Sequence, residues 1–231
     1  VGSEMCIRDR GLKPEEKDAY FLRGSAELEL GDYESAKADF DQAISMDPKN
    51  YDRLIEIYEA LAAHGYREVG QEYLQNVLDT AKQLDAYDSG RIYYYLGEYQ
   101  KAYLALDEAR DKGGADSYLY LGRAYAATGD YNYASSVYNN YLSKQGPNAE
   151  IYNELGLCEM AKKEYQNALA AFQAGKQIEG NSLMQTLCFN EIVAYEYLED
   201  YQQAEILMNA YLQNYPDDQT AIREQQFLST R

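Results

Sequence analysis

Hydrophobic and polar residues follow a helical spacing along this chain, and the pattern restarts after a little over thirty residues. In the stretch "LGDYESAKADF", residues 30–40, an alanine follows a tyrosine by three positions and precedes a bulky apolar residue by four. Similar stretches begin at Gly97, Gly129, Lys163 and Glu199. Apolar residues three and four positions apart predict amphipathic helices, and a fixed period of this length predicts a stacked array of repeats.

The copies can be aligned on their alanine in a frame of 34 positions, in which that alanine is position 20. Three positions of this frame are informative. Position 20 is small in every copy: Ala36, Gly70, Ala102, Ala134, Ala168 and Ala204. Position 8 is glycine in four of six copies: Gly24, Tyr58, Gly90, Gly122, Gly156 and Ile192. Position 24 is always bulky: Phe40, Leu74, Leu106, Tyr138, Phe172 and Met208. Small residues let two helix backbones approach and the bulky residue fills the space beside them, so each copy is predicted to be a helical hairpin.

The turn inside each hairpin has its own pattern. Glycine at position 15 ends the first helix of four copies, and an acidic residue follows in five of six, where it stabilises the start of the second helix. Tyrosine stands at position 17 in five copies. We interpret most of the 26 tyrosines as packing residues rather than as a binding site.

This pattern resembles the tetratricopeptide repeat (TPR) family. The segment "YLYLGRAY", residues 118–125, is similar to the first half of the family's motif, and "GDYESAKADFDQAISMDP", residues 31–48, is similar to the second half. The resemblance implies an all-α fold, a right-handed superhelical solenoid of antiparallel helix hairpins. We expect about six repeats and a C-terminal capping helix.

The repeat frame also sets the expected domain boundaries. Residues 1–16 carry no repeat pattern and are interpreted as a disordered or non-native leader. Six repeats are expected over residues 17–217, with starts near 17, 51, 83, 115, 149 and 185. Residues 218–231 begin with a helix N-cap signal and carry Ile222 and Phe227 among polar residues. We interpret this segment as a capping helix that covers the sixth repeat.

The second repeat departs from the pattern, because Tyr58 replaces the glycine at position 8. The apolar spacing of Leu54, Ile57, Tyr58 and Leu61 remains helical. We therefore expect a hairpin with a shifted contact between its helices, and a helix over residues 54–61.

Composition narrows the classes of partner. The formal charge of −18 opposes binding of nucleic acid and of anionic lipid, and makes basic partners easier to accommodate. No apolar run is long enough to span a membrane, so no direct membrane insertion is expected. Cys6, Cys158 and Cys188 are too few and too irregularly spaced for a disulfide framework.

Catalytic chemistry has little support in the sequence. His64 is the single histidine and precedes a glycine at a predicted helix end, and no cysteine or acidic cluster around it has the spacing of metal ligands. Phosphate-binding and nucleophile motifs are absent. We expect no enzyme activity, no cofactor and no metal site.

Three functions follow as hypotheses. The first is a protein interaction scaffold that binds an unidentified protein or peptide in a concave groove, as the resemblance implies. The second is the repeat domain of a bacterial envelope lipoprotein that binds a protein or a glycan; it requires a signal upstream of the given residues, and a cytoplasmic location follows otherwise. The third is an enzyme whose chemistry comes from another chain or domain.

A partner site is predicted in the third to fifth repeats. First-helix positions that line the groove in the family carry two arginines, three tyrosines and an asparagine: Tyr87, Arg91, Tyr94, Tyr95, Arg123 and Asn153. The arginines are expected to face one concavity and to hold a carboxylate or phosphate, with the rings supporting the guanidinium groups. The alternative is that Arg91 and Arg123 pair with nearby acids such as Asp88 and Asp116 and neutralise the groove.

Overall fold

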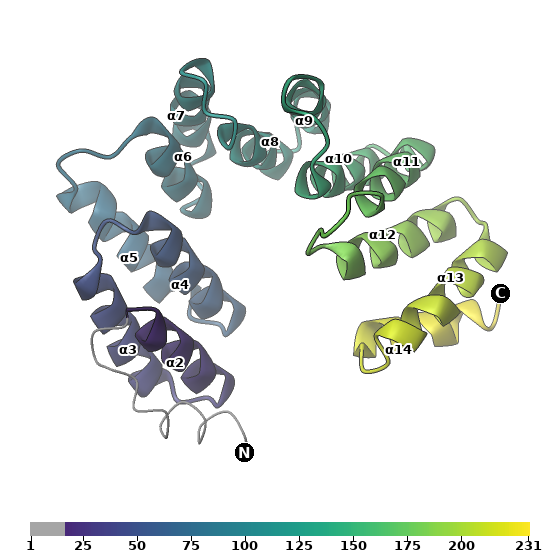
Figure 1. Ribbon diagram of the computed structural model, residues 1–231, viewed down its shortest axis with the longest axis horizontal. Coiled ribbons are helices and arrows are strands. Elements are labelled where there is room, and N and C mark those ends of the chain that lie inside the picture. Colours follow the sequence, from purple (N-terminus) through teal and green to yellow (C-terminus); the bar gives the residue numbers. More distant parts are fainter. Residues whose placement is uncertain (1–16) are drawn as a thin grey trace. The chain divides into compact units, whose positions relative to one another are not determined.

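The computed structural model describes residues 17–231, and the predicted leader lies outside this range. The described part is all-α and contains thirteen helices and no strand (Figure 1). The helices are α2 Lys17–Glu29, α3 Tyr33–Met46, α4 Tyr51–Ala63, α5 Arg67–Thr80, α6 Ala86–Tyr95, α7 Tyr99–Asp111, α8 Ser117–Ala127, α9 Tyr131–Gln145, α10 Ala149–Ala161, α11 Tyr165–Lys176, α12 Met184–Tyr197, α13 Tyr201–Asn214 and α14 Gln219–Leu228. Adjacent helices pack in pairs, which confirms the predicted all-α solenoid.

The chain divides into two compact units, and the division falls between Glu98 and Tyr99, inside the third repeat. Unit 1 contains α2 to α6, and unit 2 contains α7 to α14. No helix among residues 17–231 combines the length and the apolar character needed to cross a bilayer.

Unit 1 is held together by two groups of buried side chains. The first joins α2, α3 and α4 through Leu28, Ala36, Phe40, Ile57 and Leu61. The second joins α4, α5 and α6 through Leu54, Ile55, Tyr58, Leu74 and Ile92. Each helix therefore buries its apolar side against its neighbours in the sequence, as expected for stacked hairpins.

Unit 2 continues the same packing through three further groups of buried side chains. Its first helices α8, α10 and α12 follow one another along one side of the unit, and the second helices α9, α11 and α13 lie on the other side (Figure 1). The core between α12, α13 and α14 contains Ile192, Ala204, Met208, Tyr211, Ala221 and Leu228. This arrangement places one continuous row of first-helix side chains on a single face.

Glycine at position 8 makes room for the bulky residue at position 24. A Cβ on Gly122 would lie 2.3 Å from the ring of Tyr138, and one on Gly156 would lie 2.3 Å from the ring of Phe172. Both rings are fully buried, so they have no space to withdraw. The small and large residues at these two positions are thus complementary, as the sequence pattern predicts.

The second repeat reverses this complementarity. Helix α4 covers residues 54–61, which confirms the predicted helix. Tyr58 is buried at position 8, and a Cβ on Gly70 at position 20 would lie 2.9 Å from its ring. The large residue stands here on the first helix and the missing side chain on the second, so the two helices pack closely all the same.

The turn at positions 15 and 16 has the predicted geometry. The glycines at position 15 have positive φ angles, and the fifth and sixth repeats use Lys163 (φ 64°) and Glu199 (φ 60°) at the same place. The following acids Asp32, Asp130 and Asp200 accept hydrogen bonds from backbone N–H groups of the next helix. These aspartates are N-caps, so they fix where the second helices begin.

Helix α14 packs against the helices of the sixth repeat. Asp218 is its N-cap, as expected. Ala221 and Leu228 are the buried residues of α14, whereas Ile222 is half-buried and Phe227 is 38% exposed. The ring of Phe227 also contacts Tyr201 of α13, with 6.5 Å between the ring centroids.

Candidate functional site

One face of unit 2 is formed by side chains of its first helices, and we call it the inner face. It consists of residues from α8, α10 and α12 and from the start of α14: Tyr120, Arg123, Glu150, Asn153, Glu154, Leu157, Gln185, Thr186, Phe189, Asn190 and Asp218. Side-chain hydrogen bonds join α8 to α10 and α10 to α12, and they make this face continuous.

Arg123 joins α8 to α10. Its Nε donates to Glu154 at 2.9 Å, and its Nη2 donates to Glu154 at 2.7 Å and to Glu150 at 3.0 Å. Burial opposes the charged guanidinium, but the carboxylates of Glu154 and Glu150 outweigh it, so the pKa of Arg123 lies above its ordinary value. The Arg123 guanidinium also lies 5.5 Å from the ring centroid of Tyr120. This cation is therefore fully engaged within the protein.

A pair of amides joins α10 to α12. The Nδ2 of Asn190 donates to the Oδ1 of Asn153 at 2.9 Å, and Asn153 is buried, with 8% of its surface exposed. One amide atom of each residue is used in this bond, which leaves the Nδ2 of Asn153 and the Oδ1 of Asn190 as a donor and an acceptor. Leu157 lies one helical turn beyond Asn153 and is 43% exposed. The centre of the inner face thus combines amides with exposed apolar surface.

A recess of about 280 Å³ lies at the end of this face. It is lined by Gln185, Thr186, Phe189, Asn190, Tyr211, Asp218 and Thr220. The hydroxyl of Tyr211 donates to Asp218 at 2.6 Å, and the Nε2 of Gln185 donates to the Tyr211 hydroxyl at 3.1 Å. The hydrogen bond from Tyr211 and those from the N–H groups of Ala221 and Thr220 lower the pKa of Asp218. The recess therefore holds an ionised carboxylate at neutral pH.

Unit 1 contains the other predicted arginine. Arg91 is buried, with 6% of its surface exposed, and it forms ion pairs with Asp52 of α4 and Asp88 of its own helix. Burial opposes its charge, but the hydrogen bonds that it donates to these two carboxylates raise its pKa. Its guanidinium lies 4.5 Å from the ring centroid of Tyr87, so the predicted cation–π contact is present.

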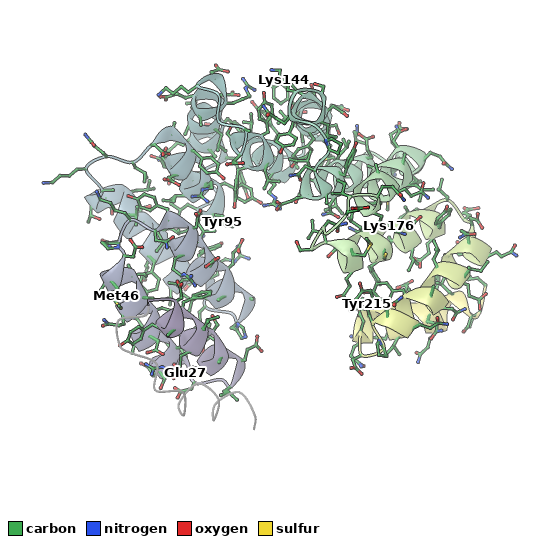
Figure 2. All side chains as sticks on the ribbon, viewed as in Figure 1. Glu27, Met46, Tyr95, Lys144, Lys176 and Tyr215 are labelled. Atoms are coloured by element: carbon green, nitrogen blue, oxygen red, sulfur yellow. The ribbon has the colours of Figure 1, made fainter. Side chains whose placement is uncertain are left out.

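The tyrosines near the end of α6 contact other rings of unit 1. Tyr95 is labelled in Figure 2. Tyr95 lies 5.1 Å from the ring of Tyr58, and its hydroxyl donates to Glu59 of α4. Tyr94 packs edge-on against Tyr95 at 5.1 Å. Tyr95 thus connects α6 to α4, in line with the structural role expected for most tyrosines.

These contacts bear on the predicted arginine site. Arg91 pairs with Asp88, which the sequence-based alternative named, whereas Arg123 pairs with Glu150 and Glu154 rather than with Asp116. Each guanidinium is neutralised by two carboxylates within its own unit, so neither presents uncompensated positive charge. The assignment of Tyr87, Arg91, Tyr94, Tyr95, Arg123 and Asn153 to partner binding stays a prediction.

Sequence reasoning missed several inner-face residues. Glu154 and Asn190 occupy position 6 of the fifth and sixth repeats, one residue after the position used to select Asn153. Examination of position 6 in adjacent repeats, alongside position 5, could therefore have identified both residues from the sequence. Asp218 lies beyond the repeat frame. It lines the recess because it is the N-cap of α14, and α14 begins next to the recess.

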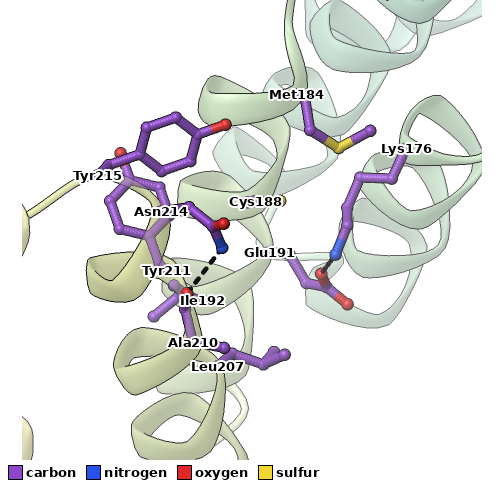
Figure 3. Close-up of a pocket in the computed structure, with 10 residues that line it drawn as sticks. All are labelled: Lys176, Met184, Cys188, Glu191, Ile192, Leu207, Ala210, Tyr211, Asn214 and Tyr215. Carbon is purple, nitrogen blue, oxygen red and sulfur yellow. Dashed lines mark hydrogen bonds and ion pairs between the residues drawn. The ribbon is translucent and has the colours of Figure 1, made fainter. Parts of the chain in front are cut away.

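The outer side of unit 2 contains a second recess, a cleft of about 550 Å³ between α11, α12 and α13. Lys176 and Met184 line one side of it, and Tyr211, Asn214 and Tyr215 line the other (Figure 3). Lys176 is paired with the buried carboxylate of Glu191, and Asn214 donates to the Ala210 carbonyl of its own helix. The charges of Lys176 and Glu191 therefore compensate each other within this cleft.

The residues considered for catalysis have structural contacts. Burial, followed by the charges of Glu154 and Glu159, raises the pKa of the Cys158 thiol to about 12, so it is protonated at neutral pH. The Nδ1 of His64 lies 2.9 Å from the carbonyl of Ala60 in the preceding turn. Within residues 17–231, no group of three or more histidine, cysteine or acidic side chains is placed as metal ligands would be.

The packed hairpins and the continuous face of first-helix side chains define an α-helical repeat protein. Sequence profiles of the tetratricopeptide repeat match residues 17–50, 87–138 and 121–181. These matches together span more than half of the chain, which therefore belongs to the tetratricopeptide repeat family. Proteins of this family are typically non-catalytic scaffolds.

Solved structures of other proteins share the fold. PilW, a widely conserved type IV pilus biogenesis factor, has a TM-score of 0.63 and 17% identity over 92% of this chain and 97% of its own. PilF of Pseudomonas aeruginosa has a TM-score of 0.52 and 18% identity over 93% and 97%. YrrB, a TPR protein with an unusual peptide-binding site, has a TM-score of 0.53 and 18% identity over 81% and 97%. A search of curated protein sequences found no match.

Proposed function

We propose that this protein is a non-catalytic scaffold that binds a segment of a partner protein on the inner face of unit 2. The observation that supports it is the pair Asn153 and Asn190, which joins two first helices and leaves an amide donor and an amide acceptor next to the exposed side chain of Leu157. An extended polypeptide offers backbone N–H and C=O groups that match such amides.

The exposed apolar surface fits the same function. Leu157 is 43% exposed in the middle of a row of polar side chains, and the recess beside Phe189 is large enough for a side chain. A segment that crosses α10 and α12 would bury both, and burial of apolar area is the main source of affinity at protein interfaces. The peptide-binding site described for YrrB belongs to that protein, and it shows that the fold can carry one.

Site-specific photo-crosslinking tests this proposal. Random peptides displayed on phage are selected on the full chain, and the selected peptides are then crosslinked to variants in which benzoylphenylalanine replaces either Leu157 on α10 or Ile206 on α13. Both side chains are exposed, at 43% and 55%, so the two probes are equally accessible. We expect crosslinks from position 157 and none from position 206. Crosslinks from position 206 alone would overturn the proposal.

A variant with the amides removed provides a second measurement. We expect Asn153→Ala together with Asn190→Ala to weaken binding of the selected peptides at least tenfold, since the bond between α10 and α12 and both remaining amide atoms are lost. The far-UV circular dichroism of the double variant verifies that the helices are intact. Unchanged peptide affinity would exclude the amides from the site.

A second candidate is the envelope domain that binds a protein or a glycan, and one observation favours a glycan-binding surface. The ring of Tyr197 at the end of α12 is 57% exposed and stacks on Tyr165 at 5.0 Å. Exposed aromatic rings provide stacking area for sugars. Carbohydrate crosslinked to a benzoylphenylalanine in place of Tyr197, with none at position 157, would favour this candidate over the first.

A further inference from the structure

Charge is unevenly distributed over the helices of the inner face. Arg123 is the one lysine or arginine in α8, α10 and α12. The same three helices carry five glutamates: Glu150, Glu154, Glu159, Glu191 and Glu196. Glu159 and Glu191 are buried and paired with lysines, Lys162 and Lys176. Glu150 and Glu154 remain as the carboxylates placed beside Arg123.

Arg123 and its two carboxylate partners together carry a net negative charge. One guanidinium faces the two carboxylates of Glu150 and Glu154, and Glu150 keeps 47% of its side chain exposed. The Nε and Nη2 of Arg123 already donate to these acids, which opposes binding of a further anion. The surface therefore attracts cations at this end rather than the carboxylate or phosphate expected from the sequence.

The recess at the other end of the inner face also carries negative charge. Asp218 is one of its walls and the aromatic ring of Phe189 is another. The aliphatic part of a lysine or arginine side chain packs on such a ring, while its charged end reaches the carboxylate. Asn190 lines this recess and bonds to Asn153, which directly precedes Glu154 on α10.

We propose that the inner face of unit 2 binds an extended polypeptide segment with at least two basic residues. One basic side chain enters the recess between Phe189 and Asp218, and another lies over Glu150, while the amides of Asn153 and Asn190 bond to the backbone between them. This inference rests on the proposed function and adds the chemical class of the partner. Acidic and neutral segments lack the charges that this face complements.

The test compares three fluorescent ten-residue peptides for binding to the full chain by fluorescence anisotropy. They alternate threonine with lysine, with glutamine or with glutamate. We expect the lysine peptide to bind at least tenfold more tightly than the glutamine peptide, and the glutamate peptide not to bind. Equal affinity of the lysine and glutamine peptides would overturn the inference.

A pair of matched variants separates this site from general attraction to an acidic protein. Asp218→Asn removes one negative charge from the recess but keeps a good N-cap for α14. Glu205→Gln removes one negative charge from an exposed position on α13. We expect Asp218→Asn to weaken binding of the lysine peptide at least fivefold and Glu205→Gln to change it less than twofold. Equal effects of the two variants would show that only net charge matters and would overturn the inference.

The two proposals fail in different ways. If the selected peptides crosslink from position 157 and yet are neutral or acidic in sequence, the inner face is a peptide site without the proposed preference. If the lysine peptide binds but crosslinks only from position 206, the preference exists elsewhere and the inner face is excluded as its site.

Discussion

Complementary sizes at two positions explain how the hairpins close. In the fifth repeat, Gly156 lies against the fully buried ring of Phe172, with no room for a methyl group. In the second repeat, Gly70 lies against Tyr58. The sequence identifies which residues are small and which are bulky, and the structure adds which pairs of them touch. In both repeats, a glycine on one helix therefore lets a bulky side chain of the other helix approach closely.

The change Gly156→Ala tests this complementarity. Its Cβ would come 2.3 Å from a ring that cannot move aside, so we expect a loss of about 1–3 kcal/mol in the free energy of unfolding, as in other overpacked cores. Urea denaturation followed by circular dichroism measures it. Adding Phe172→Leu should recover part of the loss, because the smaller side chain leaves space for the methyl group. If the single variant is as stable as the original protein, the contact is not tight in solution.

At the scale of helices, the sequence predicts the elements well and the surface less well. The repeat period, the small residues and the turn glycines can all be read from residues close together in the sequence. The hairpins and the helix over residues 54–61 were therefore predictable. The partners of Arg123 were not, because Glu150 and Glu154 lie on another helix and are brought close only by the packing of α8 and α10. The recess was missed for the same reason, since α12, α13 and α14 each supply part of it.

The contact between α12 and α14 is expected to depend on pH. Burial and the neighbouring carboxylate of Glu224 raise the pKa of Glu196 to about 7. The pKa of a glutamate in an unfolded chain is about 4.3. Between these values the folded protein holds a proton that the unfolded chain releases, so this group makes the protein more stable as the pH falls from about 8 to about 5. Thermal melts at several pH values measure the effect.

The control for this prediction is a pair of glutamine variants. Glu196→Gln imitates the protonated form, so its melting temperature should vary less with pH than that of the original protein. Glu205→Gln removes an exposed carboxylate from α13 and should leave the variation unchanged. An identical pH profile for Glu196→Gln and the original protein would show that Glu196 does not titrate in this range.

At the scale of the whole molecule, every helix contacts mainly its neighbours in sequence. The buried groups of unit 1 involve α2 to α6, and those of unit 2 that are centred on α10 involve α8 to α11. Stability in such a chain is close to a sum of repeat and neighbour contributions, so a local defect stays local. The chain is therefore not expected to unfold as one cooperative block.

Amide hydrogen exchange of Gly156→Ala measures this locality. We expect faster exchange in α8 to α12 and unchanged exchange in α2 to α5. The same measurement on the original protein provides the reference for each helix. Equal acceleration in all helices would mean that the two compact units unfold together, contrary to packing that is mainly between neighbouring helices within each unit.

The reversed pair in the second repeat restricts how this chain can have been built by duplication and recombination. Tyr58 on α4 requires the missing side chain at Gly70 on α5, whereas the glycines on α8 and α10 require the bulky rings on α9 and α11. A crossover between the two helices of a hairpin would bring two large side chains together or leave a void. Crossovers between hairpins would keep each complementary pair intact, so the helix pair rather than the single helix is the unit of complementary packing.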